Sequence, residues 1–141
     1  MYRQIEDTYL TSGQVRFGYW HMAFLGPESG WAAEASECAD EQDAFWEYHD
    51  YLYNHQSCEN AGAFTRDNLK LFAAELGLDE AAFNECLDSG RYADVIEEQT
   101  TTAQGLGVSS TPAFMINGQP MLGAQPFTSF QAVIEPLLAV P

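Results

Sequence analysis

The chain has 141 residues, 46% of them hydrophobic, and a formal net charge of −16 from 21 acidic and five basic residues. This length favours a single domain with a substantial apolar core, and the charge disfavours binding to nucleic acids and anionic membranes. No apolar run approaches the roughly 18 residues that a membrane helix needs. Residues 1–7 lack the apolar segment of a secretory signal peptide, so either the protein stays in the cytoplasm or its original N-terminus lies elsewhere.

The first quarter of the chain predicts a helix, a strand and a second helix. Apolar residues over 2–10 lie near one helical face, and Gly13 ends this short helix. Alternating side chains over 14–20 predict a strand. A turn at 26–29 then leads into a helix whose buried face recurs at helical spacing, namely Trp31, Ala35, Cys38 and Ala39.

Four more helices are expected along the middle of the chain. Asp43, Thr65 and Asp79 are candidate N-caps of the first three. Gly90 follows the third helix and is expected to stop it. The fourth helix is expected over 91–106. The middle of the chain is therefore predicted to be entirely helical.

The C-terminal part predicts a hairpin followed by a helix. Strands at 112–116 and 121–122 flank Asn117-Gly118, which is the strongest short hairpin signal. A last helix over 126–138 begins with a proline, as the first position of a helix favours. Pro136 is expected to end or kink that helix.

The run from Gly107 to Gly118, which contains Thr111-Pro112, resembles the cis-proline loop of thioredoxin-fold thiol oxidoreductases of the DsbA-like branch. The resemblance covers essentially the whole chain from about residue 2. Its other matching blocks are Gly26-Pro27-Glu28-Ser29, Trp31-Ala-Ala-Glu, Glu37-Cys38-Ala39, the run Phe45-Trp46-Glu47-Tyr48-His49-Asp50, and Cys86-Leu87-Asp88-Ser89-Gly90.

The resemblance implies an α/β thioredoxin-like fold with an inserted helical domain. Residues 1–25 and 107–141 correspond to the thioredoxin-like part, and residues 26–106 to the helical insertion. Members of the family work with a Cys-x-x-Cys pair that faces the proline, and this sequence contains no Cys-x-x-Cys. The family's first core strand also has no counterpart here.

In the family the absent strand is central, between the strands expected at 14–20 and 112–116. Its removal leaves backbone donors and acceptors unpaired on both neighbours. Three arrangements would satisfy these groups: the two strands pair directly, a second copy fills the gap, or another polypeptide supplies a strand. We expect a homodimer among these three.

The three cysteines are Cys38, Cys58 and Cys86. By resemblance to relatives with a structural bridge in the helical region, Cys38 and Cys86 are expected to form a disulfide that contributes about 3–4 kcal/mol. Two buried free thiols and a relocated redox pair are the alternatives, although neither cysteine has the basic neighbours that activate a thiol. Cys58 lies in a polar loop and is expected to be free and exposed.

Thr111 and Pro112 are the candidate substrate-binding residues, because the family's proline loop exposes backbone groups to an extended peptide. The alternative is an inherited turn that only shapes the sheet. His49, His55 and Cys58 lack the regular spacing of a zinc site, so no metal is expected. No phosphate-binding or hydrolase motif is present, and no cofactor is expected.

The sequence favours a redox-inactive binding or assembly module, with a peptide, a protein or a second copy as its partner. The alternative is the C-terminal portion of a thiol:disulfide oxidoreductase whose Cys-x-x-Cys lies upstream. The family is mostly extracytoplasmic, which contrasts with the absence of an export signal in residues 1–7.

Overall fold

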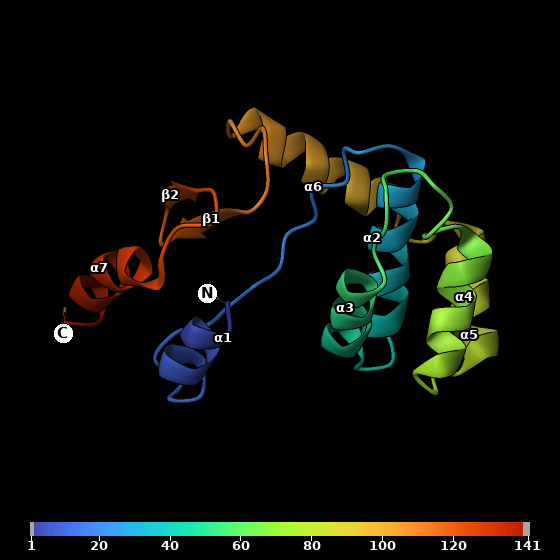
Figure 1. The fold of residues 1–141 in the computed structure, drawn as a ribbon, viewed down its shortest axis with the longest axis horizontal. Helices are drawn as coiled ribbons and strands as arrows, with labels where there is room; N and C mark the ends of the chain where they lie inside the picture. The colour runs from blue at the N-terminus through green and yellow to red at the C-terminus, as the bar shows by residue number, and fades with distance from the viewer. Residues whose placement is uncertain (1, 140–141) are drawn as a thin grey trace. The chain divides into compact units, whose positions relative to one another are not determined.

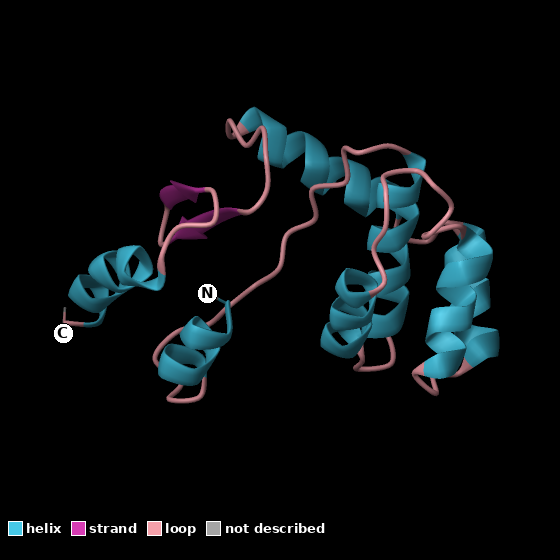
Figure 2. Cartoon of the chain, viewed as in Figure 1, coloured by secondary structure: helices cyan, strands magenta, loops and turns pink. Residues whose placement is uncertain are grey.

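The computed structural model describes residues 2–139 and divides the chain into two compact units. One unit combines the residues up to Trp20 with those from Gln104 onward, and the other comprises His21–Ala103. The first holds a two-stranded sheet and the terminal helices, whereas the second is helical (Figures 1 and 2). Among the described residues, no helix is both long and apolar enough to cross a membrane.

The first unit contains a short N-terminal helix, a π-helical turn, a two-stranded sheet and a C-terminal helix. A short helix α1 (Tyr2–Ile5) continues into a π-helical turn η1 (Glu6–Leu10). Strands β1 (Ala113–Ile116) and β2 (Gln119–Leu122) form the sheet, and helix α7 (Phe127–Leu138) follows.

One small apolar core holds these segments of the first unit together. Ile5 and Tyr9 pack with Phe130 and Ile134 of α7, and all four are nearly inaccessible to solvent. Partly buried side chains of the hairpin complete the cluster, namely Phe114, Ile116 and Met121. The sheet is therefore covered on the face that carries these three residues.

Three sequence predictions for this unit differ from the structure. Residues 14–20 form no strand, because within the described residues β1 pairs with β2 alone and the segment has no strand beside it to complete a ladder. Pro126 is the N-cap of α7 rather than its first helical residue. The helix also continues through Pro136 to Leu138, so of the two predicted effects of this proline the end of the helix is wrong.

The second unit contains five helices: α2 (Pro27–Asp40), α3 (Phe45–Asn54), α4 (Arg66–Glu75), α5 (Glu80–Ser89) and α6 (Ala93–Gly105). Helices α2–α5 share one core, and α4 lies beside α5 in Figure 1. The largest buried members are Tyr48, Leu69, Phe83 and Leu87. The hydroxyl of Tyr48 donates to the carbonyl of Leu69 at 2.7 Å, which satisfies both polar groups inside the core.

Helix ends in this unit follow the predicted capping residues at three of four positions. Thr65 accepts a hydrogen bond from the backbone of Asn68, and Asp79 accepts from two amides of the first turn of α5. Gly90 ends α5 in the left-handed conformation, with φ of 62°. Asp43 is not a cap: it adopts a φ of 57° in the tight connection after α2, so that Ala44 becomes the N-cap of α3.

Candidate functional site

A tight turn fixes the register of the β1–β2 hairpin. Asn117 and Gly118 have φ angles of 45° and 84°, the positive values that a type I′ turn requires. Ile116 therefore lies opposite Gln119, and Phe114 opposite Met121. In a two-residue hairpin the pair of residues beside the turn exchanges backbone hydrogen bonds. Further along the strands, non-hydrogen-bonded pairs, whose backbone groups point outward, alternate with hydrogen-bonded pairs.

This alternation makes the two edges of the hairpin different. Pro120 lies at a position whose backbone points away from β1, so its missing N–H leaves the outer edge of β2 without a donor there. On β1 the outward-pointing positions are Ala113 and Met115, and both retain an N–H and a carbonyl. Within residues 2–139 no strand pairs with this edge. The edge of β1 is therefore open to a further strand, whereas Pro120 protects the edge of β2.

The hairpin also has two apolar faces. Phe114, Ile116 and Met121 face the core shared with α1, η1 and α7. The opposite face carries Ala113, Met115, Pro120 and Leu122. On that face Met115 is 52% exposed and Leu122 is 54% exposed.

The predicted substrate-binding residues directly precede this edge. The Thr111–Pro112 peptide bond is cis. The carbonyl of Pro112 accepts a hydrogen bond from the amide of Gly123 at 2.8 Å, which ties the loop to the far end of β2. Thr111 and Pro112 thus lead straight into the open edge at Ala113.

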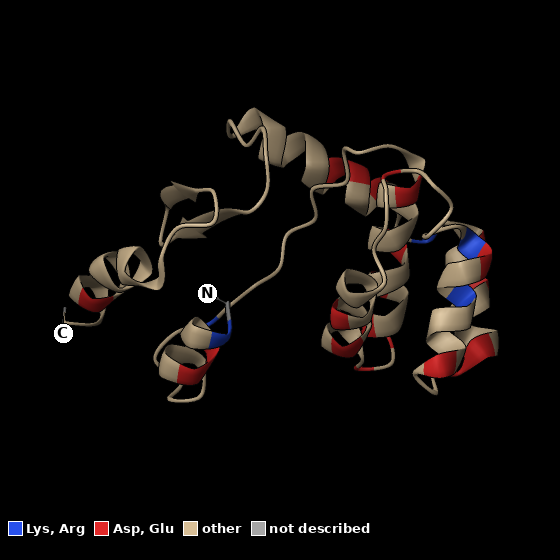
Figure 3. Ribbon diagram, in the orientation of Figure 1, with Lys and Arg blue, Asp and Glu red and all other residues tan. Residues whose placement is uncertain are grey.

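Charge is distributed very unevenly between the units (Figure 3). All acidic residues except Glu6, Asp7 and Glu135 lie in His21–Ala103. No Asp, Glu, Lys, Arg or His occurs from Gln99 to Ile134, a stretch that contains the whole hairpin. The hairpin therefore lacks the charged side chains that usually discourage pairing at a strand edge.

Cys38 and Cys86 form a disulfide with an S–S distance of 2.01 Å between α2 and α5. The two residues are 1% and 0% exposed and belong to the core of the helical unit. An exchange reaction needs a sulfur that an attacking thiolate can reach. Burial of both sulfurs favours a structural bridge over a relocated redox pair.

Cys58 is exposed and free, and it lies in the loop between α3 and α4. The residues weighed as zinc ligands have other contacts. His49 approaches Asp50 at 3.1 Å, and the ring of His55 stacks on Tyr51 with centroids 3.9 Å apart. Within residues 2–139, no three His, Cys, Asp or Glu side chains are grouped so that they could hold a metal ion.

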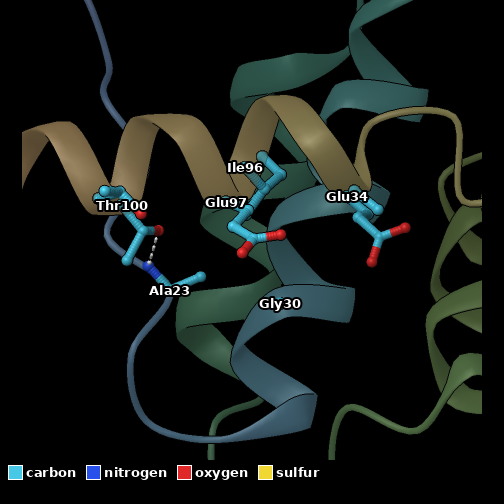
Figure 4. A pocket seen from close by; sticks show the side chains of 8 residues that line it. Ala23, Gly30, Glu34, Ile96, Glu97 and Thr100 are labelled. Carbon is cyan, nitrogen blue, oxygen red and sulfur yellow. Dashed lines mark hydrogen bonds between the residues drawn. The ribbon is translucent and has the colours of Figure 1, made fainter.

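A cavity of about 200 Å³ lies between α2 and α6 in the helical unit, lined by Ala23, Gly30, Glu34, Ala93, Ile96, Glu97, Thr100 and Thr101 (Figure 4). Thr100 accepts a hydrogen bond from the amide of Ala23 at 3.0 Å. Burial raises the pKa of Glu34, and Arg66 opposes that shift from 3.7 Å. One Glu34 oxygen, Oε2, is buried without a hydrogen-bond partner.

Comparison with known proteins identifies the family. Residues 1–136 match the family model described as Thioredoxin. This chain belongs to the thioredoxin family. Its fold is that of the DsbA-like proteins, mostly helical with a small sheet. Oxidised BdbD from Bacillus subtilis superimposes with a TM-score of 0.86 at 23% identity, over 98% of this chain and 76% of that chain. Reduced DsbA from Mycobacterium tuberculosis gives a TM-score of 0.59 at 22% identity, over 85% of this chain and 64% of that one.

Two curated relatives are similar over most of this thioredoxin-family chain. The Na(+)/H(+) antiporter NhaA of Herminiimonas arsenicoxydans is 34% identical over 109 residues, which are 77% of this chain and 17% of that protein. Disulfide bond formation protein D of Bacillus subtilis is 23% identical over 138 residues, which are 96% of this chain and 62% of that protein. The chain thus spans less than a fifth of the antiporter and under two thirds of the disulfide bond formation protein.

Two features of the structure, one in each unit, were not predicted from the sequence. The protective position of Pro120 follows from counting outward from Asn117-Gly118, so the signal was present in the sequence. The buried carboxylate of Glu34 had no such signal, because acidic residues on a helix are usually solvated. Only the packing of α2 against its neighbours places Glu34 inside.

Proposed function

We propose that this chain is a binding module of the thioredoxin family that accepts an extended polypeptide strand at β1 without exchanging disulfides itself. The observation that carries the proposal is the unequal pair of hairpin edges, with Pro120 on one side and the intact backbone of Ala113 and Met115 on the other. Backbone pairing gives such a site its affinity, and side-chain pockets beside it give its preference.

The position of the proline loop supports this proposal. Thr111 and Pro112 immediately precede β1, so a strand that pairs with Ala113 would run alongside them. Redox inactivity is supported by the cysteines: the sequence holds no Cys-x-x-Cys, the Cys38–Cys86 bridge is buried, and Cys58 is alone in its loop.

Hydrogen exchange at single amides tests the binding mode. In the monomeric chain without a partner the amides of Ala113 and Met115 should exchange quickly, whereas those of Phe114 and Ile116 point toward β2 and should exchange slowly. An extended peptide that binds as proposed slows Ala113 and Met115. Binding that leaves both rates unchanged would place the partner elsewhere and refute the proposal.

Turnover of a disulfide substrate tests the inactive state. Reduction of insulin disulfides by the chain should not exceed the rate with dithiothreitol alone. Turnover that is lost in Cys38→Ser or Cys86→Ser but kept in Cys58→Ser would establish the relocated redox pair instead.

A second candidate function is the C-terminal portion of a thiol:disulfide oxidoreductase. It is favoured by the likeness over 96% of this chain to a disulfide bond formation protein of which the chain spans 62%. A Cys-x-x-Cys segment fused before residue 1 should then restore insulin reduction. A fusion that folds and remains inactive would favour the binding module.

A homodimer is a further way to satisfy the edge of β1, and we propose it for the chain without another partner. The uncharged hairpin is where two acidic copies would repel each other least. Sedimentation equilibrium should then show a dimer that Met115→Pro dissociates, since proline removes an outward N–H from that edge. A monomer at all concentrations would refute this form of association.

A further inference from the structure

The two faces of the hairpin indicate what kinds of side chain the partner strand carries. This inference rests on the proposed function. We infer that the strand accepted by β1 is uncharged and apolar on both of its faces, a core-type strand rather than an amphipathic one. The argument starts from the two faces of the hairpin itself.

A strand added beside β1 continues both faces of the sheet. On one face its side chains would come next to Phe114 and Ile116, which already pack on the core of the first unit. Polar side chains at those positions would extend a partly buried apolar surface with groups that lose part of their water. This face therefore favours apolar residues at every second position of the partner.

The other face sets the same requirement at the intervening positions. There the neighbours are Ala113 and Met115 on β1, with Leu122 beyond them on β2. Met115 leaves more than half of its surface accessible, and a cross-strand apolar contact with it would stabilise a bound strand. Leu122 is also more than half exposed, but it lies one strand further away, behind the small Ala113, so that only a long side chain of the partner would reach it. A strand buried on both faces reads as a continuous apolar run, whereas a strand with one wet face alternates.

Electrostatics disfavour a strongly charged partner at the edge of β1. The absence of charged side chains from Gln99 to Ile134 leaves nothing in the hairpin to pair with a charged residue of the partner. The acidic residues are concentrated in His21–Ala103 instead. A basic peptide would be attracted to that helical unit and not specifically to β1.

Three peptides with identical lysine tails test the inference. The first has seven consecutive Val and Ile residues, the second alternates Val with Gln, and the third is the first with a central proline. Binding is measured at 0.5 M salt, where the Debye length is about 4 Å, so that the tails gain little from the acidic helical unit. Exchange of the Ala113 and Met115 amides reports whether a peptide occupies the edge.

The expected order is clear. The continuous apolar peptide should bind at least about tenfold more tightly than the alternating one, because two or three more apolar side chains leave water. The proline peptide should not bind, since it cannot form the ladder. Equal binding of the first two, with Ala113 and Met115 protected, would overturn the two-face inference and leave the proposed function standing. Failure of both to protect these amides would refute the proposed function as well.

Two protein variants test the exposed face of the hairpin, and a third variant is the control. Leu122→Gln should reduce the preference for the continuous peptide over the alternating one. Met115→Gln should lower the affinity for the continuous peptide about tenfold. Leu71→Gln is the matched control, because Leu71 is 60% exposed on α4 in the helical unit and should change nothing. The exchange measurements use the chain at concentrations where it sediments as a monomer. Slow exchange at Ala113 and Met115 in that monomer without any peptide would overturn the inference by showing that the edge is already covered.

Discussion

Opening the Cys38–Cys86 disulfide should lower the free energy of unfolding of the helical unit by about 4 kcal/mol. The bridge spans 48 residues of sequence. In the chain-entropy model a closed loop of this length removes about 14 cal/mol/K from the unfolded chain, which is about 4 kcal/mol at 25 °C. The bridge joins α2 to α5, so the effect belongs to the core that these helices share.

The comparison that isolates the cross-link uses one sequence in two states. Urea unfolding of the oxidised and the fully reduced chain should give free energies of unfolding that differ by about 4 kcal/mol. The urea midpoints should differ by this energy divided by the m-value. Trp31 is a suitable fluorescent probe because it packs against the same core. Reduced Cys38 and Cys86 leave two small, mostly apolar thiols in place, so packing changes little.

Two controls bracket this prediction. Cys58→Ser removes the exposed thiol and should leave both unfolding curves unchanged, since Cys58 takes no part in the bridge. Cys38→Ala with Cys86→Ala should behave like the reduced chain, with a further loss for the missing sulfur atoms. Oxidised and reduced chains that agree within about 1 kcal/mol would refute the loop argument, because the predicted difference is several times larger.

The redox behaviour of the same pair gives an independent measurement. A buried structural bridge should equilibrate with glutathione at a potential below about −300 mV. Thiol trapping with intact-mass detection across a glutathione series measures this potential. A potential between about −120 and −270 mV lies in the range of thiol–disulfide exchange enzymes. Such a value would favour the hypothesis that Cys38 and Cys86 are a relocated redox pair.

The remaining predictions concern single side chains of the helical unit. Burial raises the pKa of Glu34 above its ordinary value, so the folded state holds this proton more tightly and loses stability as pH rises through that raised pKa. The Glu34→Gln variant should therefore be more stable than the parent chain by about 1 kcal/mol at pH 7 and no different below pH ~4. Equal stability of the two chains at pH 7 would contradict the conclusion that the buried carboxylate is destabilising. Thr65→Ala should cost about 1 kcal/mol by removing the N-cap of α4, whereas Thr65→Ser should restore most of it in the same thermal melts. Glu28 accepts hydrogen bonds from the amides of Gly62 and Phe64 at 2.8 Å each, so Glu28→Ala should destabilise by roughly 2–3 kcal/mol and speed hydrogen exchange at those two amides; unchanged exchange would show that the loop holds itself.

Local sequence signals determined most of the elements and their ends. Thr65 and Asp79 cap helices because a short side-chain oxygen next to an apolar period satisfies first-turn amides wherever it occurs. Asn117-Gly118 fixed the hairpin for a similar reason, since both residues tolerate positive φ and the strands on either side follow. The resemblance in Gly107–Gly118 carried the fold class, which the family model and the solved structures then showed.

The tertiary structure decided what local signals could not. The alternation at 14–20 is compatible with a strand, but a strand exists only when another lies beside it, and within the described residues β1 pairs with β2 alone. Asp43 has a good capping side chain, yet the length of the α2–α3 connection requires it in a left-handed turn. The burial of Glu34 and the open edge at Ala113 and Met115 likewise depend on neighbours distant in sequence, because exposure and pairing are properties of the packed chain.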